Sequence, residues 1–308
     1  MKHLRIASRA SKLALVQTNY IVKLLESRCP GIETTIIEVS TKGDRDKSDF
    51  LYKSESVGFF TSEIEKSLLD GRADLAVHSF KDLPTQQRPG LIVAAVPPRQ
   101  SPADALVAPE AVTSINDLRP GTTVGTSSLR RIAQLKLLRD DIECVPLRGN
   151  VETRIRKVAE GRVDAIIVAC AGLNRLGLTD KISLVLPPGE FIPAPAQGAL
   201  AVQIRSDDNE LIELARQIDD ENSRIAVETE RYVLGVMHGG CSIPLGVYSQ
   251  ISGGEITTCA IICSVDGEKY VRHSVTSSID QAKIAAGKLA RKLLDNGGRE
   301  ILIRIKND

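Results

Sequence analysis

A cysteine that follows two glycines is the residue of this chain best suited to covalent chemistry. Cys241 comes after Gly239 and Gly240 and is followed by a Ser-Ile-Pro turn. Because glycine permits positive φ and close approach to the backbone, we expect this thiol on a loop that a bulky group can reach. The segment predicts a thiol that anchors something large.

Arginines recur where predicted strands lead into predicted helices. In the run GTSSLRR (125–131), Ser127 and Ser128 are suitable helix caps, and Arg130 and Arg131 fall in the first helical turn. Cations there oppose the helix dipole, and a bound anion would reverse that cost. The alternative for this turn alone is an arginine pair that faces water.

The same arrangement occurs twice more. Arg148 precedes the helix cap Asn150, with Arg154 in the first turn, and Arg9 and Ser11 precede the first predicted helix. Arginine suits the bidentate recognition of carboxylates, so several arginines together predict a ligand with several carboxylates or phosphates. The chain has neither a G-x-x-x-x-G-K-[ST] nor a G-x-G-x-x-G motif, which disfavours a nucleotide.

A polar cluster follows the apolar run 73–77. Asp82 lies beside Lys81 and is expected to stay ionised in cationic surroundings, where it could stabilise a cation or move a proton. The alternative is an ordinary turn aspartate before Pro84. His78 is expected to be a structural hydrogen-bonding group rather than a base. The four histidines show no metal-ligand spacing, so no metal site is expected.

The composition disfavours several functional classes. The 308 residues include 40 basic and 39 acidic side chains, no Trp and only 3% aromatics, which disfavours a nucleic-acid or membrane-surface binder. The six cysteines include no C-x-x-C pair, and all except Cys241 are interpreted as reduced core residues. Neither a signal peptide nor an apolar run of about 18 residues is found, so the cytoplasm is the expected compartment.

Strand and helix patterns alternate twice and then change, which predicts an α/β fold. Two lobes like those of periplasmic binding proteins are expected to be joined by hinge crossings near the proline pairs, with ligands bound between them. A small C-terminal α+β domain follows, with a long helix from about 220 to 236, several strands, a helix 279–294 and a final strand 300–305. The predicted domains are residues 1–97 with 197–216, residues 98–196, and residues 220–308.

Six runs in this order carry a resemblance to a known family: HSFKDLP, GTSSLRR, LRGNVETR, AGLNRLG, PAPAQGA and GGCSIPLG. Over essentially its whole length the chain resembles the porphobilinogen deaminases, also called hydroxymethylbilane synthases. The resemblance implies a monomeric transferase of heme and porphyrin biosynthesis. Such an enzyme joins four porphobilinogen units, with loss of ammonia, into linear hydroxymethylbilane on a covalent dipyrromethane primer.

The resemblance also implies roles for individual residues. Cys241 would hold the dipyrromethane through a thioether, and Asp82 would be the catalytic carboxylate. The remaining cofactor-binding positions would be Lys81, Ser127, Ser128, Arg130 and Arg131. Substrate carboxylates would be bound by Arg9, Ser11, Arg148, Arg154 and Arg175, with Gln17 and Gln197 as weaker candidates.

The polar segment 41–56 is expected to be a lid, and the chain departs from the family pattern at two positions. Val57 stands where the family commonly has a lysine within a glycine-rich run, and Lys12 stands where proline is usual. Two other functions remain open from the residues alone. One is a two-lobed solute receptor without catalysis, and the other is a transferase with a free nucleophilic thiol at Cys241.

Overall fold

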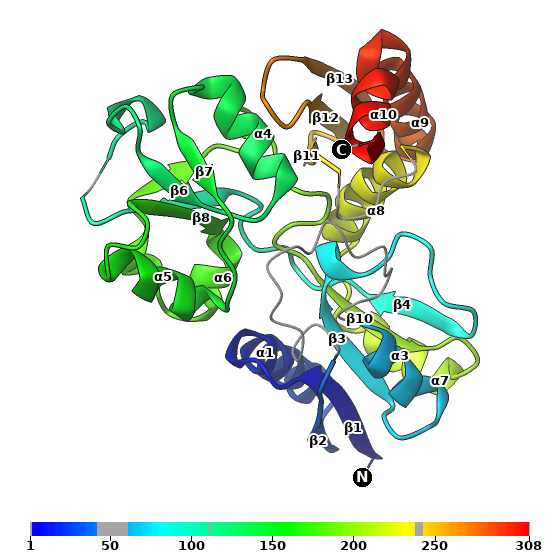
Figure 1. Cartoon of the computed structure of the whole chain (residues 1–308). Helices are drawn as coiled ribbons and strands as arrows, with labels where there is room; N and C mark the ends of the chain where they lie inside the picture. Colours follow the sequence, from blue (N-terminus) through cyan, green and yellow to red (C-terminus); the bar gives the residue numbers. More distant parts are fainter. Residues whose placement is uncertain (1, 42–60, 111, 238–242, 308) are drawn as a thin grey trace. The chain divides into compact units, whose positions relative to one another are not determined.

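The computed structural model describes residues 2–41, 61–110, 112–237 and 243–307 (Figure 1). These residues form two compact units. One comprises the described parts of Met1–Lys47 and Ser56–Gln100 together with Gly198–Arg224. The other comprises Ser101–Gln197 and the described parts of Ile225–Asp308. The predicted residue boundaries of three domains stay predictions.

The first unit is built on a five-stranded sheet in the order β2-β1-β3-β10-β4. Strand β1 is parallel to β2 and β3, whereas β10 is antiparallel to β3 and β4. Side chains of β3 alternate between the two faces of the sheet, because a strand has a period of two. Its strands are β1 (Lys2–Arg9), β2 (Ile32–Val39), β3 (Leu75–Ser79), β4 (Leu91–Ala95) and β10 (Leu200–Arg205).

Helices cover both faces of this sheet. Leu75 and Val77 pack with residues of helices α1 (Lys12–Arg28) and α7 (Asn209–Arg216), while Ala76 packs with α3 (Ser62–Leu69). Apolar burial on both faces is what the continuous apolar runs of the sequence predict for an α/β sheet.

The second unit repeats this plan in a sheet of order β7-β6-β8-β5-β9. Strand β6 is parallel to β7 and β8, and β5 is antiparallel to β8 and β9. The strands are β5 (Asp104–Val107), β6 (Thr123–Gly125), β7 (Glu143–Val145), β8 (Ala165–Ala169) and β9 (Leu184–Leu186). Helices α5 (Val151–Ala159) and α6 (Cys170–Arg175) cover one face, and α4 (Leu129–Leu138) covers the other.

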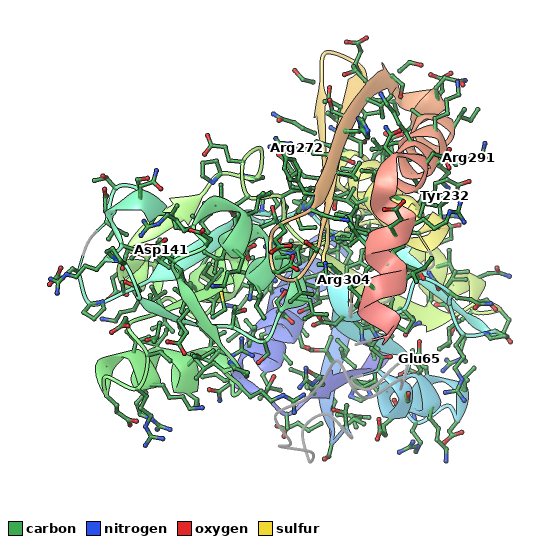
Figure 2. The ribbon with its side chains drawn as sticks, turned by 45° about the horizontal axis from the view of Figure 1, so that its top comes forward. Glu65, Asp141, Tyr232, Arg272, Arg291 and Arg304 are labelled. Atoms are coloured by element: carbon green, nitrogen blue, oxygen red, sulfur yellow. The ribbon has the colours of Figure 1, made fainter. Side chains whose placement is uncertain are left out.

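The second unit also contains the C-terminal part, an antiparallel sheet of order β11-β12-β13 with helices on one face. The strands are β11 (Leu245–Ser252), β12 (Glu255–Cys263) and β13 (Tyr270–Ser278), and the helices are α8 (Glu221–Val236), α9 (Ala282–Leu293) and α10 (Arg299–Asn307). The first turn of α8, up to Arg224, is assigned to the first unit. Ala133 of α4 packs against Ile261 and Cys263 of β12. In Figure 2, Arg272 on β13 is labelled, and its guanidinium donates a hydrogen bond to the carbonyl of Gly189. The α/β fold with two lobes and a small C-terminal α+β part is therefore confirmed.

One predicted element is wrong. The segment 300–305, predicted as a strand, lies within helix α10. Ile301 and Ile305 are four residues apart and join the same apolar cluster, so helical spacing buries both of them. The predicted helix 279–294 begins with a 3₁₀ turn, Ile279–Gln281, and continues as α9. None of the described helices has the length and apolar content needed to cross a lipid bilayer.

Candidate active site

Asp82 is presented to solvent by two apolar anchors. It ends the 3₁₀ turn Phe80–Asp82, which directly follows β3. Phe80 is buried, and its N–H donates to the carbonyl of Ala199 at 3.0 Å. Leu83 is also buried and donates back to the carbonyl of Phe80 at 3.3 Å. Between these anchors Lys81 is half-buried and Asp82 is exposed, so the carboxylate is held at the surface where a substrate can reach it.

The end of β1 and the start of α1 lie at the same edge of the first sheet as this turn. Ser11 caps α1 as predicted, accepting from the N–H of Ala14 at 3.3 Å. The Gln17 amide donates to the Ser79 hydroxyl at 2.9 Å, which ties α1 to the end of β3. Because β1 and β3 are parallel, Arg9 at the carboxyl end of β1 and Asp82 just after β3 lie at the same edge of the sheet.

His78 is buried within a chain of polar side chains. Its Nε2 donates to Gln203 Oε1 at 3.1 Å, and the Gln203 amide donates to Glu65 Oε1 at 3.1 Å (Glu65 is labelled at α3 in Figure 2). The pKa of His78 is lowered to about 4, mainly because the ring is buried; the hydrogen bond to Gln203 opposes this shift, and the charge of Arg9 adds to it. His78 is therefore neutral at neutral pH, which agrees with its predicted structural role.

In the second unit, the turn from β6 into α4 is tied to the turn after β7. Thr126 donates its N–H to the carbonyl of Val145 at 2.9 Å. The Ser127 hydroxyl donates to the carbonyl of Leu147 at 3.1 Å and accepts from its N–H at 3.1 Å. Ser128 occupies the predicted N-cap position, but its side chain makes no capping hydrogen bond.

Arg130 and Arg131 do not face water, so the alternative of a solvated pair is wrong. Both are buried and both pair with Asp104 at the start of β5, which is fully buried. Arg130 Nη2 lies 2.7 Å from one carboxylate oxygen, and Arg131 Nη2 lies 2.7 Å from the other. Burial lowers the pKa of the Arg130 guanidinium, which Asp104 raises and Arg131 lowers. One carboxylate faces two guanidiniums, which leaves this group of three with an excess positive charge.

A second pair of arginines adds to this charge. Asn150 caps α5 as predicted, accepting from the N–H of Thr153 at 2.8 Å, and Arg154 Nε donates to the carbonyl of Gly149 at 2.8 Å. The pKa of Arg154 is lowered to about 10, mainly by burial and in addition by the charges of Arg131 and Arg148. The cationic cluster, defined here as Arg130, Arg131, Arg148 and Arg154, is therefore close enough for its members to repel one another.

The remaining predicted site residues have different surroundings. Gln197 is fully buried, and its amide donates to Asp104 Oδ1 at 3.0 Å and to the carbonyl of Pro102 at 2.8 Å. Its amide nitrogen therefore holds Asp104 and the backbone at Pro102 in place. Arg175 is half-buried at the end of α6. Cys241, Val57 and most of the predicted lid lie outside the described residues.

The cationic cluster suits a ligand with several carboxylates or phosphates. The Nε of Arg130 is buried and has no hydrogen-bond acceptor among the described residues. A buried unpaired donor costs free energy of about 1–3 kcal/mol, and mutual repulsion between guanidiniums adds to that cost. An anionic ligand would relieve both, which is the chemistry that the arginine-bearing turns predict.

Two buried acids of this unit were not predicted from the sequence. Asp104 begins the apolar strand β5, and Glu230 lies on the apolar stripe of α8 between Val227 and Val233. An acid within an apolar run needs a partner when it is buried. That signal was present at both positions, but nothing in the local pattern identifies the partner.

Two family models and several relatives match this chain. The model of the family "Porphobilinogen deaminase, dipyromethane cofactor binding domain" matches residues 4–213, and that of "Porphobilinogen deaminase, C-terminal domain" matches residues 224–295. A porphobilinogen deaminase of Syntrophomonas wolfei is 44% identical over 302 residues, covering 98% of each chain. One of Maridesulfovibrio salexigens is 42% identical over 305 residues, covering 99% of each chain.

Solved structures with low sequence identity also align. The methionine-binding protein MetQ aligns at 10% identity and a TM-score of 0.45, covering 72% of this chain and 92% of that one. The Bordetella pertussis BvgS VFT2 domain aligns at 18% identity and a TM-score of 0.41, covering 70% and 86%. The two family models together span most of the chain, and the relatives match it from end to end. On this evidence the chain belongs to the porphobilinogen deaminase family.

Proposed function

We propose that this chain polymerises four porphobilinogen molecules into linear hydroxymethylbilane, with loss of ammonia, on a dipyrromethane held by Cys241. The observation that carries this proposal is the cationic cluster, with its excess positive charge and its buried, unpaired Arg130 Nε. A polypyrrole with acetate and propionate side chains has the carboxylates that such a cluster needs. The family to which the chain belongs carries a dipyrromethane cofactor binding domain.

The residues fit a polycarboxylate cofactor. Its carboxylates would be held by Arg130 and Arg131, with Ser127, Ser128 and Lys81. The hydroxyl of Ser128, which makes no capping hydrogen bond, would donate to one of them. When bound, the dipyrromethane supplies the pyrrole terminus that is extended. Asp104 keeps the two guanidiniums apart and oriented, so that donors not engaged by protein groups face the ligand.

Other residues would bind the carboxylates of porphobilinogen. We assign this role to Arg9, Ser11, Arg148, Arg154 and Arg175. Gln17 and Gln197 act in positioning, because both are buried and their amides hydrogen-bond protein groups. Together with the cofactor role of Arg130 and Arg131, this assignment accounts for the arginines at all three strand-to-helix turns.

Asp82 would perform the proton chemistry. Loss of ammonia from porphobilinogen leaves a cationic carbon, which a nearby carboxylate stabilises. As a carboxylate, Asp82 can also accept the proton that the attacked pyrrole carbon loses once the new carbon–carbon bond has formed. Its exposure on an anchored turn supports this role, since the carboxylate reaches outward while Phe80 and Leu83 keep the backbone in place.

Intact mass under denaturing conditions tests the proposal. The purified protein, or the apo-protein incubated with porphobilinogen, should gain the mass of two linked pyrrole units, and Cys241→Ser should not. Cys259→Ser is the matched control, because Cys259 is a half-buried cysteine of the same unit and should leave the adduct intact. An unmodified Cys241 that reacts with an alkylating reagent after incubation would instead favour a nucleophilic thiol. Reversible binding of porphobilinogen without turnover would favour a solute receptor.

We further propose that the enzyme acts as a monomer in the cytoplasm, without a nucleic-acid or membrane partner. The near-balanced charge supports the lack of a polyanionic partner. Light scattering of the purified protein at micromolar concentration tests the monomer, and a mass of twice 33.3 kDa would contradict it.

A further inference from the structure

Ala196 adopts a backbone conformation that its side chain disfavours. Its φ is 61°, and no other non-glycine residue has a positive φ in the part of the chain that the structure describes. The left-handed region costs an L-residue with a Cβ about 1–2 kcal/mol, so something must compensate. Such strained positions are found where surrounding contacts enforce them, often close to functional sites.

The strain arises from the type of turn that the loop makes. Gln197 donates its N–H to the carbonyl of Ala194 at 2.9 Å, so residues 194–197 form a β-turn with Pro195 and Ala196 at its centre. Proline at the first central position with a positive φ at the second defines a type II turn, in which glycine is the usual second residue. A type I turn would give Ala196 a comfortable negative φ and would need only a rotation of the central peptide by about 150–170°.

A buried carboxylate holds that peptide in the type II orientation. Glu230 of α8 is fully buried, and its Oε2 accepts from the N–H of Ala196 at 2.6 Å. Its other oxygen accepts from the N–H of Ser249 in β11 at 2.8 Å, which fixes the carboxylate from a second side. In a type I turn the N–H of Ala196 would point away from Glu230, and a buried carboxylate would lose a short hydrogen bond.

The turn leads directly into the contacts that hold the cationic cluster. Gln197, the next residue, donates to the carboxylate that pairs with both Arg130 and Arg131. Upstream on the same loop, the carbonyl of Ile192 accepts from Arg130 Nη1 at 2.9 Å. The loop 192–197 therefore contacts Arg130 directly at one end and the countercharge of both arginines at the other.

From these contacts we infer that Glu230 is a positioning residue, which selects the strained type II turn at Pro195-Ala196 and thereby places Gln197 on Asp104 and the arginine pair. The consequence for activity rests on the cofactor-binding role proposed above for that pair. The selection of the type II turn by Glu230 does not depend on that role, and a measurement of thermal stability tests it separately.

The thermal measurement compares two alanines of one turn. Ala196→Gly removes the strain, so its melting temperature should stay the same or rise. Ala194→Gly is the matched control, because Ala194 does not have a positive φ, and its melting temperature should fall by about 2 °C or more. An equal fall for both variants would show that Ala196 is not strained and would overturn the inference.

The functional measurement is a double-mutant cycle between Glu230 and Ala196. Glu230→Gln should slow the gain of cofactor mass by apo-protein, and lower kcat/KM, by about tenfold. Adding Ala196→Gly to that variant should raise both quantities again by about fivefold, because glycine lowers the free-energy cost of the type II turn by about 1 kcal/mol. Ala196→Gly alone should change the rate of mass gain and kcat/KM by less than about twofold, because Glu230 already holds the type II turn in that protein.

A control separates turn selection from general damage near Glu230. Thr258→Ala removes a hydrogen bond of 2.9 Å to the Ser249 hydroxyl, beside the same carboxylate, without touching the turn. Ala196→Gly should not improve that variant. If Ala196→Gly also fails to improve Glu230→Gln, the inference is overturned. If Glu230→Gln does not fold, the melting temperatures of Ala196→Gly and Ala194→Gly test the inference. If wild type never gains the adduct, the proposed function is wrong, and the inference about the turn is still tested by those melting temperatures.

Discussion

Arg131 and Asp104 meet at a single carboxylate oxygen, which accepts from Arg131 Nη2 at 2.7 Å and from Arg131 Nε at 3.1 Å. The other oxygen lies 2.7 Å from Arg130 Nη2. One buried acid thus orients two cations that come from the first turn of α4. Helix α4 can begin with two arginines because Asp104, on strand β5, supplies their countercharge.

Replacing this acid should be costly. Asp104→Asn leaves two buried guanidiniums without a countercharge, and breaking a buried pair in this way costs about 3–5 kcal/mol. Urea titration should show that loss, and the apo-protein should take up cofactor mass more slowly. Asp74→Asn is the control, because Asp74 pairs with the more exposed Arg5 and its loss should cost about 1 kcal/mol. Equal losses of unfolding free energy in the two variants would show that Asp104 does not stabilise the cationic cluster.

Asp82→Asn should separate catalysis from stability. Because Asp82 is exposed, the melting temperature of the variant should match that of wild type, while its kcat falls by a factor of about 10² or more. A steady-state assay with porphobilinogen measures kcat, and calorimetry measures the melting temperature. Asp180→Asn, a change at another exposed aspartate, should alter neither. Near-normal turnover by Asp82→Asn would remove Asp82 from the mechanism.

Arg154 should bind ligand, whereas its neighbour on α5 should not. Arg154→Gln removes a charge-assisted hydrogen bond, so KM for porphobilinogen or the apparent affinity for cofactor should worsen by about tenfold. Arg156→Gln is matched in chemistry and helix but affects an exposed side chain that pairs with Glu160. Initial rates over a range of substrate concentrations compare the two. The same KM in both variants would contradict the assignment.

Burial of His78 predicts a pH dependence of stability. The pKa is about 4 in the folded state and about 6.5 when unfolded, so the unfolded chain binds more protons between these values. Stability should therefore be fully present above pH 6.5 and fall as the pH is lowered, by about 2 kcal/mol between pH 7 and pH 5. Urea titrations of wild type and His78→Gln at both pH values isolate this contribution. A variant with the same pH dependence as wild type would contradict it.

Local patterns predicted most of the elements that hold the site. The caps Ser11 and Asn150 predicted where α1 and α5 begin. These signals depend only on residues within about one helical turn or one strand, so they can be read without the fold. The short strands β5 and β9 carried too little periodicity to be predicted.

The segment 300–305 shows where local reading fails. Its isoleucines favour a strand by propensity, yet the structure places them in α10, where Ile301 and Ile305 complete the core of the C-terminal part. Propensity is a weak preference that tertiary packing overrides. The choice between strand and helix was made by the apolar surface of α8 and α9, which no local window contains.

The sequence by itself determined the family, the reactive positions Cys241 and Asp82 as candidates, and the cationic character of the ligand-binding turns. The tertiary structure decided how those cations are held. Asp104 pairs with arginines 26 and 27 residues away, and Glu230 binds a peptide 34 residues away. Such pairings form only after the strands and helices have packed, because charges far apart in the chain meet through the fold and leave no periodic signal in the sequence.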